Sequence, residues 1–354
     1  MVERKRIVFI VNPVSGTTAK KKVLKLSDTK VDRKVYDFDI VRTEYVGHAT
    51  ELARNAAKRG VDVVCAIGGD GTVNETARGL IHTQTALAII PQGSGNGLAR
   101  HLHIPTDPEQ AIKIINKGLV IDMDYGLVNH RPFFCTCGVG FDAFISQKFA
   151  EAGKRGPLTY IENVLNNGLT YNPEIYDLEL INTQDGKEER HVQKAYVISC
   201  ANASQYGNNA YIAPDASVCD GLMDVTVMEP FTAIEAPAIA LQLFTGDIDR
   251  NSRIKTFRCQ RAIIRRRSSG AIHYDGDPVE EEAIIEVSIV PAGIKCVYPG
   301  KEGKMDFGES IQSLLSEHFR NIYAKSEEII QSNLRKSQRI TQLNVDIIRK
   351  LSKK

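Results

Sequence analysis

The sequence predicts an α/β region built on an open parallel sheet up to about residue 126, followed by a region of short antiparallel strands. The first region is predicted because apolar, β-branched runs of strand length alternate with amphipathic helix patterns, and Gly-rich turns follow the runs. The second is predicted by short alternating runs of apolar and polar residues, which Gly, Asn and Asp separate. At 354 residues the chain also exceeds the usual size of one hydrophobic core, so at least two domains are expected.

The strands of the first region are expected where apolar residues run without a break, as they do in strands that are buried on both faces. Residues 6–11, 61–67 and 86–90 form such runs. Residues 48–59 and 73–81 have apolar residues at helical spacing. Because helix alternates with strand, we expect the strands to run parallel, with their carboxyl ends at one edge of the sheet.

After residue 126 the pattern changes to that of an antiparallel β domain. The expected strands include residues 195–200, 222–228, 261–265 and 284–290, and a helical stretch is inserted at 143–169. From about residue 307 the chain has the pattern of a long polar and amphipathic helix. We therefore expect an α/β nucleotide-binding domain at residues 1–126, a β domain that takes the substrate at 127–306, and a basic helical tail at 307–354.

Composition excludes several classes of protein. The chain is 42% hydrophobic and 25% charged, which is typical of a globular protein rather than a disordered or disulfide-dense one. Its 45 Lys and Arg nearly balance 43 Asp and Glu, so nothing indicates a nucleic-acid partner. The N-terminus lacks the pattern of a secretion signal, and no apolar stretch approaches the roughly 20 residues of a spanning helix. We therefore expect a cytoplasmic protein with peripheral membrane contact.

Two Gly-rich turns, residues 68–72 and 93–97, each follow an expected buried strand and precede a helix. At that position backbone N–H groups and a helix N-terminus favour a phosphate group. Glycine suits such turns because a Cβ would block the approach of a phosphate to the backbone. A third turn at residues 12–16 ends the first strand, so three strand ends are expected to converge on one edge. The turns match neither the Walker A motif nor the Rossmann fingerprint.

Asp70 stands inside the first of these turns, where its negative charge would repel a phosphate. A metal ion or a transferable proton would explain a carboxylate there. The alternative is that Gly-Gly-Asp-Gly forms only a tight turn. The local sequence around Asp275 likewise also fits a simple Asx turn.

Three ordered motifs in the first region resemble the diacylglycerol kinase and sphingosine kinase superfamily. They are Asn12-Pro-Val-Ser-Gly16, Gly68-Gly-Asp-Gly-Thr-Val-Asn-Glu75 and Pro91-Gln-Gly-Ser-Gly-Asn-Gly-Leu-Ala99. The similarity continues through residues 138–143, 213–225 and 273–277, and covers roughly residues 5–300. The resemblance implies a Rossmann-like N-terminal domain of the phosphofructokinase and NAD kinase type, a C-terminal antiparallel β-sandwich, and a nucleotide cleft between them. It also implies ATP and Mg²⁺ as cofactors and a lipid hydroxyl as the phosphate acceptor.

The resemblance assigns roles to particular residues of this chain. The residues that match nucleotide-contact positions are Asn12, Ser15, Gly16, Thr43, Gly68, Gly69, Asp70, Gly71, Thr72, Val73, Asn74, Gly93, Ser94, Asn96 and Asp277. Asp220, with the main-chain carbonyls of Met223 and Val225, matches a magnesium site of bacterial members. Asp275 matches a proposed general base. The family usually has Asp-Gly-Glu here whereas this chain has Asp275-Gly-Asp277, so a role of residue 277 would depend on a shorter carboxylate.

Phosphoryl transfer needs positioned groups and charge neutralisation more than covalent chemistry. Asp70 and Asp275 are therefore the candidate catalytic residues, one beside the metal and phosphates and the other beside the acceptor hydroxyl. The sequence does not decide which of the two is the base. We expect alanine at either position to abolish transfer and to shift the melting temperature by only a few degrees, because both are expected in an open cleft.

The block from Pro91 to Ala99 looks more like sphingosine and ceramide kinases than bacterial diacylglycerol kinases, which favours a sphingoid base as the acceptor. Asp142 matches a region that contacts the lipid headgroup, and its carboxylate could pair with the ammonium group of such a base. The alternatives are that Asp142 only caps the following helix and that the acceptor is diacylglycerol. An NAD kinase and a catalytically silent lipid- or nucleotide-binding protein are the remaining alternatives.

Two basic segments are candidate contacts with an anionic membrane surface. Residues 265–267 are three consecutive Arg, and residues 332–354 contain seven Lys or Arg and one Asp, with apolar residues at helical spacing. The alternative for the first segment is a solvated strand end. The alternative for the second is a helix that packs on its own domain or on the partner in a homodimer.

Overall fold

The structure is a computed structural model that describes residues 4–13, 17–152, 171–182, 186–232 and 234–300. The chain divides into two units, Met1–Glu302 and Gly303–Lys354, and the second lies wholly outside the described residues. The expected tail helix, most of the helical stretch expected at 143–169, and the site residues Ser15 and Gly16 also lie outside them.

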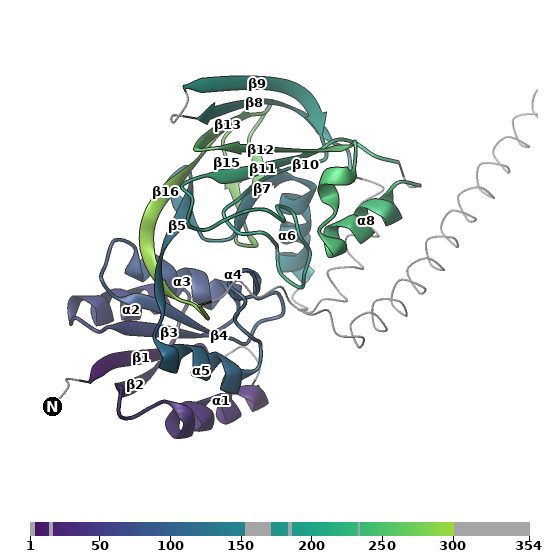
Figure 1. Cartoon of the computed structure of the whole chain (residues 1–354). Helices are drawn as coiled ribbons and strands as arrows, with labels where there is room; N and C mark the ends of the chain where they lie inside the picture. The colour runs from purple at the N-terminus through teal and green to yellow at the C-terminus, as the bar shows by residue number, and fades with distance from the viewer. Residues whose placement is uncertain (1–3, 14–16, 153–170, 183–185, 233, 301–354) are drawn as a thin grey trace, which may run out of the picture. The chain divides into compact units, whose positions relative to one another are not determined.

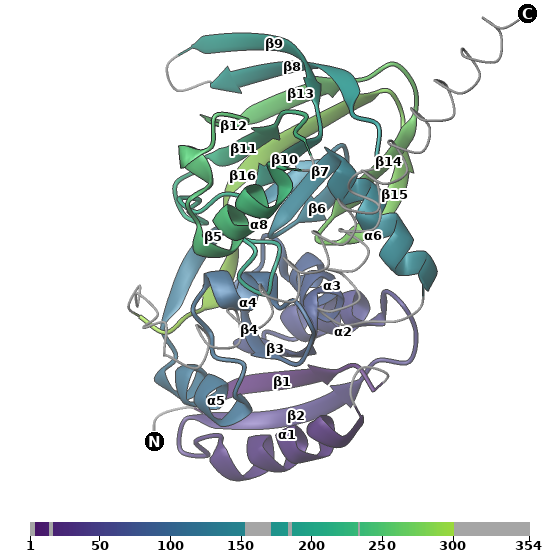
Figure 2. The same cartoon turned by 90° about the vertical axis from the view of Figure 1, so that its right-hand side faces the viewer.

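The first region contains the predicted open parallel sheet (Figure 1). Its strands are β1 (Lys5–Val11), β2 (Tyr36–Arg42), β3 (Val63–Gly68) and β4 (Ala86–Pro91), in the order β2-β1-β3-β4. Helices α2 (His48–Lys58) and α3 (Asp70–Leu80) pack together on one face, and α1 (Thr17–Lys30) and α5 (Pro108–Lys117) on the other, as Figures 1 and 2 show. The short helix α4 (Gly97–His101) follows β4. The strands expected at 6–11, 61–67 and 86–90 are confirmed.

The sequence did not predict strand β2 or helices α1 and α5. Strand β2 lies at the edge of the sheet, and three of its seven residues, Asp37, Asp39 and Arg42, are charged and exposed. It therefore lacks the continuous apolar run that identifies a strand buried on both faces. Helix α1 has no strong apolar stripe, because Lys residues interrupt its first two turns.

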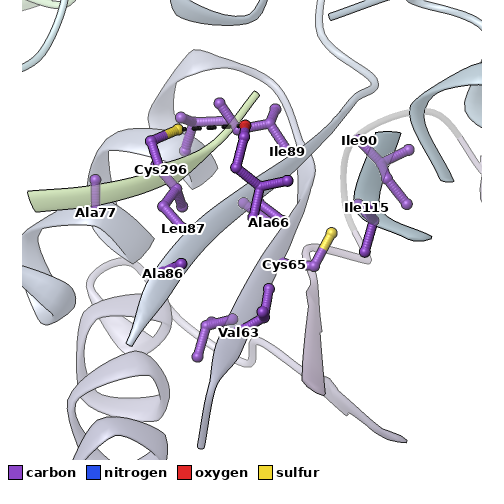
Figure 3. Packing of buried hydrophobic residues seen from close by; sticks show 14 of the residues in the cluster. Val63, Cys65, Ala66, Ala77, Ala86, Leu87, Ile89, Ile90, Ile115 and Cys296 are labelled. Atoms are coloured by element: carbon purple, nitrogen blue, oxygen red, sulfur yellow. Dashed lines mark hydrogen bonds between the residues drawn. The ribbon is translucent and has the colours of Figure 1, made fainter. Parts of the chain in front are cut away.

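The parallel sheet continues into the second region. The sequence did not reveal this continuation. Strand β16 (Ile284–Val297) bends between Val290 and Ile294, and its last residues pair in parallel with β4 through Cys296 and Leu87. Figure 3 shows Cys296 packed among the apolar side chains of the first region, including Ala77 and Leu87. The final strand of the chain's β region thus extends the parallel sheet at its β4 edge.

The remaining strands complete a ten-stranded sheet. They are β5 (Val120–Val128), β6 (Arg131–Phe133), β8 (Glu174–Asn182), β9 (Lys187–Ala195) and β13 (Arg261–Arg265). All of their pairings within this part of the sheet are antiparallel. The boundary predicted after residue 126 falls inside β5, so the sheet is continuous across that point.

A second sheet has six antiparallel strands in the order β12-β11-β10-β7-β14-β15. They are β7 (Thr136–Gly140), β10 (Val197–Ala201), β11 (Met223–Met228), β12 (Ile254–Cys259), β14 (Gly270–Tyr274) and β15 (Asp277–Glu281). Apolar side chains from both sheets form one buried cluster, which makes this region the predicted β-sandwich. The strands expected at 195–200, 222–228, 261–265 and 284–290 are confirmed within a few residues.

The outer face of the second sheet is unusually polar for a buried surface. Thr226, Ser199, Gly138 and His273 stand directly opposite one another across β11, β10, β7 and β14, so they share this face. Helices α6 (Phe141–Ala152) and α8 (Ala236–Thr245) cover one end of it, and residues 201–216 cover another part. None of the helices in the described part of the chain is long and apolar enough to cross a lipid bilayer.

Candidate functional site

A cavity of about 220 Å³ lies where the turns after β3 and β4 meet the polar face of the second sheet. The first region lines it with Asp70, Val73, Asn74, Ser94, Gly95 and Leu98. The second region lines it with Phe134, Cys135, Thr136, Asp142, Ser146, Tyr206, Gly207, Asn208, Ala210, Phe244, His273, Asp275 and Gly276. The cavity therefore brings together the two candidate catalytic residues and the candidate acceptor-binding residue.

Asp70 begins α3 and connects the two Gly-rich turns. Its Oδ1 accepts the N–H of Gly97 at 2.7 Å, and its Oδ2 accepts the N–H of Asn96 at 2.9 Å. Asn96 has a left-handed backbone with φ 54°, a conformation that Asn tolerates, and its Oδ1 accepts the N–H of Gly93 at 2.8 Å. Burial raises the pKa of Asp70, and the N–H groups of Gly97 and Asn96 offset part of that rise. Asp70 thus orders the turn at 93–97 as well as facing the cavity.

The glycines of the turns have two different reasons to be glycine. A Cβ on Gly93 would lie 2.5 Å from the Cα of Gly69, and one on Gly69 would lie 2.9 Å from the Cα of Gly93, so the two turns touch backbone to backbone. A Cβ on Gly71, in contrast, would meet nothing within 4 Å. Gly71 is in the first turn of α3, where helical N–H groups have no partner inside the helix. The open space beside that turn fits a phosphate group.

Of two other predicted nucleotide-contact residues, Asn12 lies beside α3 and Thr43 lies beside the end of β1. The side-chain amide of Asn12 donates to the hydroxyl of Thr72 at 3.5 Å, and the N–H of Thr43 donates to the carbonyl of Val11 at 3.0 Å. The ends of β1 and β2 therefore lie close to the N-terminus of α3. The sequence assigned no role to Glu75, whose carboxylate accepts the N–H groups of Gly47 and Ala49 at the start of α2, at 2.9 and 3.3 Å. In the sequence, Glu75 stood out only as the last residue of the motif at residues 68–75.

Asp275 lies in the turn between β14 and β15 with a left-handed backbone, φ 48°. Its Oδ2 accepts the side-chain amide of Asn74 at 2.7 Å and the N–H of Phe134 at 2.8 Å. Its Oδ1 accepts the N–H groups of Cys135 at 2.7 Å and Thr136 at 3.1 Å. These donors use the four lone-pair sites of a carboxylate. Asp275 thus links α3 to the β-sandwich, and the general-base role that the resemblance implies would require one of these bonds to open.

Burial raises the pKa of Asp275, and the amide of Asn74 is the largest of the hydrogen-bond donors that offset the rise. The carboxylate oxygens therefore lie in a water-poor place where ionisation is stabilised only by specific donors. Asp277, two residues further on, is exposed at the start of β15 and is not among the residues that line the cavity.

Asp142 is buried in the first turn of α6 and makes three hydrogen bonds. Its Oδ1 accepts the N–H of the next residue, Ala143, at 2.7 Å, whereas a helix cap would accept an N–H two or three residues further on. Its Oδ2 accepts the hydroxyl of Tyr206 at 3.1 Å and lies 2.9 Å from Nε2 of His273. The sequence assigned no role to His273, which was only the first residue of the 273–277 match, or to Tyr206, and the pairing of His273 with Asp142 joins positions 131 residues apart.

The predicted magnesium residues lie away from this cavity and do not fit a bound cation. The carboxylate of Asp220 accepts the N–H of Leu222 at 3.0 Å and forms an ion pair with Arg258. The Nε of Arg258 is also 3.5 Å from the buried carboxylate of Asp224. Over the described residues there is no group of three or more His, Cys, Asp and Glu side chains placed to hold a metal ion. The positive charge beside Asp220 is therefore a guanidinium.

The carbonyls of Met223 and Val225 belong to β11, which has β10 on one side and β12 on the other. Val225 stands opposite Cys200 and Phe257 in these two pairings, so its main chain takes part in the ladder of the sheet. Strong burial raises the pKa of the neighbouring Asp224 to about 6, and Arg258 offsets part of the rise.

Comparison with known proteins agrees with this architecture. A family model described as the diacylglycerol kinase catalytic domain matches residues 6–128, and one described as the YegS C-terminal NAD kinase beta sandwich-like domain matches residues 135–298. The chain belongs to the diacylglycerol kinase superfamily of lipid kinases.

Relatives with curated names point the same way. A diacylglycerol kinase of Bacillus subtilis (strain 168) is 28% identical over 281 residues, which cover 78% of this chain and 90% of that protein. One of Staphylococcus saprophyticus is 26% identical over 278 residues, 77% of this chain and 89% of that protein. The crystal structure of a diacylglycerol kinase from Bacillus anthracis str. Sterne matches with a TM-score of 0.63 over 84% of this chain and 98% of the other, and at 21% identity it shows the fold alone.

Proposed function

We propose that this chain transfers the γ-phosphate of ATP to the hydroxyl group of a lipid. The observation that supports this most directly is the composition of one cavity, in which Asp70, Asn74 and Ser94 of the nucleotide-binding turns face Asp142 and Asp275 of the β-sandwich. A phosphate donor and a hydroxyl acceptor must meet within a few ångströms, and this cavity is where the two regions meet.

In this proposal, ATP and its accompanying Mg²⁺ supply the phosphoryl group and neutralise its charge. The N-terminus of α3, with Gly71 next to open space, would hold phosphate oxygens through backbone N–H groups. Asp70 orders the turn at 93–97, so Ser94 and Gly95 are held facing the acceptor. Asp275 and Asn74 hold α3 against residues 134–136, at the junction of β6 and β7, which fixes the donor side relative to the acceptor side.

For the acceptor we propose a neutral glycerolipid of the diacylglycerol type. The sequence favoured a sphingoid base, on the argument that Asp142 could pair with an ammonium group. Two side-chain partners, Tyr206 and His273, already bind the Oδ2 of Asp142, which leaves that oxygen less available to an ammonium group. Curated relatives are named diacylglycerol kinase. A sphingoid base is the second candidate, because the carboxylate of Asp142 does line the cavity.

We also propose that the enzyme takes its acceptor from a membrane surface, which it meets from the cytoplasmic side without spanning it. A lipid acceptor with two acyl chains resides in a bilayer, so the enzyme must reach it there. The basic segments at 265–267 and 332–354 are the candidate contacts with anionic headgroups, and the second of them lies outside the described residues.

The test is an assay of the purified protein with labelled ATP and mixed micelles that contain diacylglycerol, dihydrosphingosine or neither, with NAD⁺ as a further acceptor. We expect phosphatidic acid as the main product. Label transfer to NAD⁺ alone would instead identify an NAD kinase, and no transfer to any acceptor would indicate a silent binding protein. Asp70→Asn is the matched control, and we expect it to be inactive. It keeps the size of the side chain but replaces one of the two carboxylate oxygens that accept an N–H with an NH2 group.

A further inference from the structure

Asp142 and His273 form a buried pair at the wall of the cavity. The exposed fractions of their side chains are 7% and 2%, and Nε2 of His273 lies 2.9 Å from Oδ2 of Asp142. In the tautomer with its hydrogen on Nε2, the imidazole of His273 donates to this carboxylate oxygen. The hydroxyl of Tyr206 donates to the same oxygen.

The surrounding strands are built to allow this contact. His273 of β14 stands directly opposite Gly138 of β7. A Cβ on residue 138 would lie 2.5 Å from Oδ2 of Asp142 and 3.2 Å from Nε2 of His273. Gly138 therefore leaves the space in which the carboxylate and the imidazole meet. An alanine here would push the two groups apart.

The hydrogen bonds of Asp142 determine what else its carboxylate can bind. A carboxylate has four lone-pair sites, and three are used by Ala143, Tyr206 and His273. A buried carboxylate that has lost a donor is costly and becomes a strong site for any cation that can reach it. Because His273 is itself almost fully buried, it cannot move into solvent to make room for a cationic headgroup.

We propose that His273 is a specificity-determining residue: by donating to Asp142 it leaves that carboxylate a single unused lone-pair site, which weakens its pairing with an ammonium headgroup and favours neutral lipids as acceptors. This inference rests on the proposed lipid kinase activity and deepens it. Selectivity between two acceptors is a difference of two affinities, and an occupied carboxylate acts against the cationic one. His273 acts through Asp142 and not on the reacting atoms, so it is a positioning residue.

The test compares kcat/KM for diacylglycerol and for dihydrosphingosine in the same mixed micelles. The wild-type enzyme should use diacylglycerol at least tenfold better. In His273→Leu, which keeps an apolar volume but has no donor, the ratio should shift toward dihydrosphingosine by about tenfold, the value of one lost charge-assisted contact. His273→Gln keeps a side-chain donor and should remain closer to the wild-type ratio.

A double variant separates this mechanism from a simple loss of packing. In Asp142→Asn the carboxylate is absent, so adding His273→Leu should not change the ratio further. An equal loss of activity on both acceptors in His273→Leu, or the same shift with and without the Asp142 carboxylate, would overturn the proposal. If His273→Leu does not fold, the wild-type ratio decides, because a preference for dihydrosphingosine is incompatible with an occupied Asp142. Failure of the wild type on both lipids would refute the lipid kinase activity itself.

Discussion

Replacing Asp275 by alanine should destabilise the protein as well as inactivate it, contrary to the small change expected from the sequence. The carboxylate accepts one side-chain amide and three backbone N–H groups, all at 2.7–3.1 Å. Each such bond contributes about 1 kcal/mol net, and the donors left behind are partly buried. Part of that loss is offset, because the variant no longer has the free-energy cost of burying a charged carboxylate, a cost that the raised pKa of Asp275 indicates. The expected destabilisation is therefore about 3 kcal/mol.

For a folded unit of about 300 residues, 3 kcal/mol corresponds to a fall of roughly 5 °C in the melting temperature. Thermal unfolding followed by circular dichroism, beside an ATP-turnover assay on the same preparation, gives both quantities. Asp277→Ala is the matched control, because it removes a carboxylate that is two residues away and exposed, and it should shift the midpoint by at most about 1 °C. Asp275→Asn keeps one acceptor oxygen and should lie between the wild type and the alanine variant.

The same two measurements distinguish a structural role of Asp275, which holds α3 against the β-sandwich, from a role as the general base. If Asp275→Ala unfolds at the wild-type temperature yet has lost all turnover, the carboxylate does not hold the two regions together and its role is chemical. If the variant unfolds early but keeps near-normal kcat at low temperature, Asp275 is not the base.

Three further predictions concern the phosphate site, the metal and pH. Gly71→Ala should unfold at the wild-type temperature or slightly above, because a methyl group there meets no atom and Ala favours a helix. If phosphate oxygens approach that turn, the KM for ATP should rise at least about tenfold. An unchanged KM would show that the phosphate oxygens bind elsewhere. Excess chelator should abolish turnover, since the transferred phosphate needs Mg²⁺. It should leave the melting temperature of the nucleotide-free protein unchanged, because Arg258 supplies the positive charge at Asp220; a fall of several degrees on adding chelator would show a resident ion. Burial lowers the pKa of His101 to about 4, below its ordinary value near 6.5. Between about pH 4 and about pH 6.5, His101 is therefore protonated in the unfolded state but neutral in the folded state. The free energy of unfolding should therefore fall as the pH drops from about 6.5 to about 4. The fall should be about 2 kcal/mol larger in the wild type than in His101→Gln. An equal fall in the two proteins would contradict this prediction.

Local sequence patterns predicted much of the architecture. The buried strands β3 and β4 and the turns that follow them could be predicted because apolar runs and glycines act over a few residues. The antiparallel strands of the sandwich were predicted for the same reason. The path of β16 could not be, because its parallel pairing with β4, through Cys296 and Leu87, joins residues that are far apart in the sequence.

The site shows the same division. The sequence alone determined the residue types at the phosphate turns, and the resemblance they carry singled out Asp70, Asp142 and Asp275. Only the tertiary structure decided what these carboxylates touch: Asp275 meets four donors, Asp142 meets His273, and Asp220 meets an arginine in place of an ion. The physical reason is that a buried charge is stabilised by whichever donors the fold brings near, and those donors come from strands and helices that are distant in the sequence.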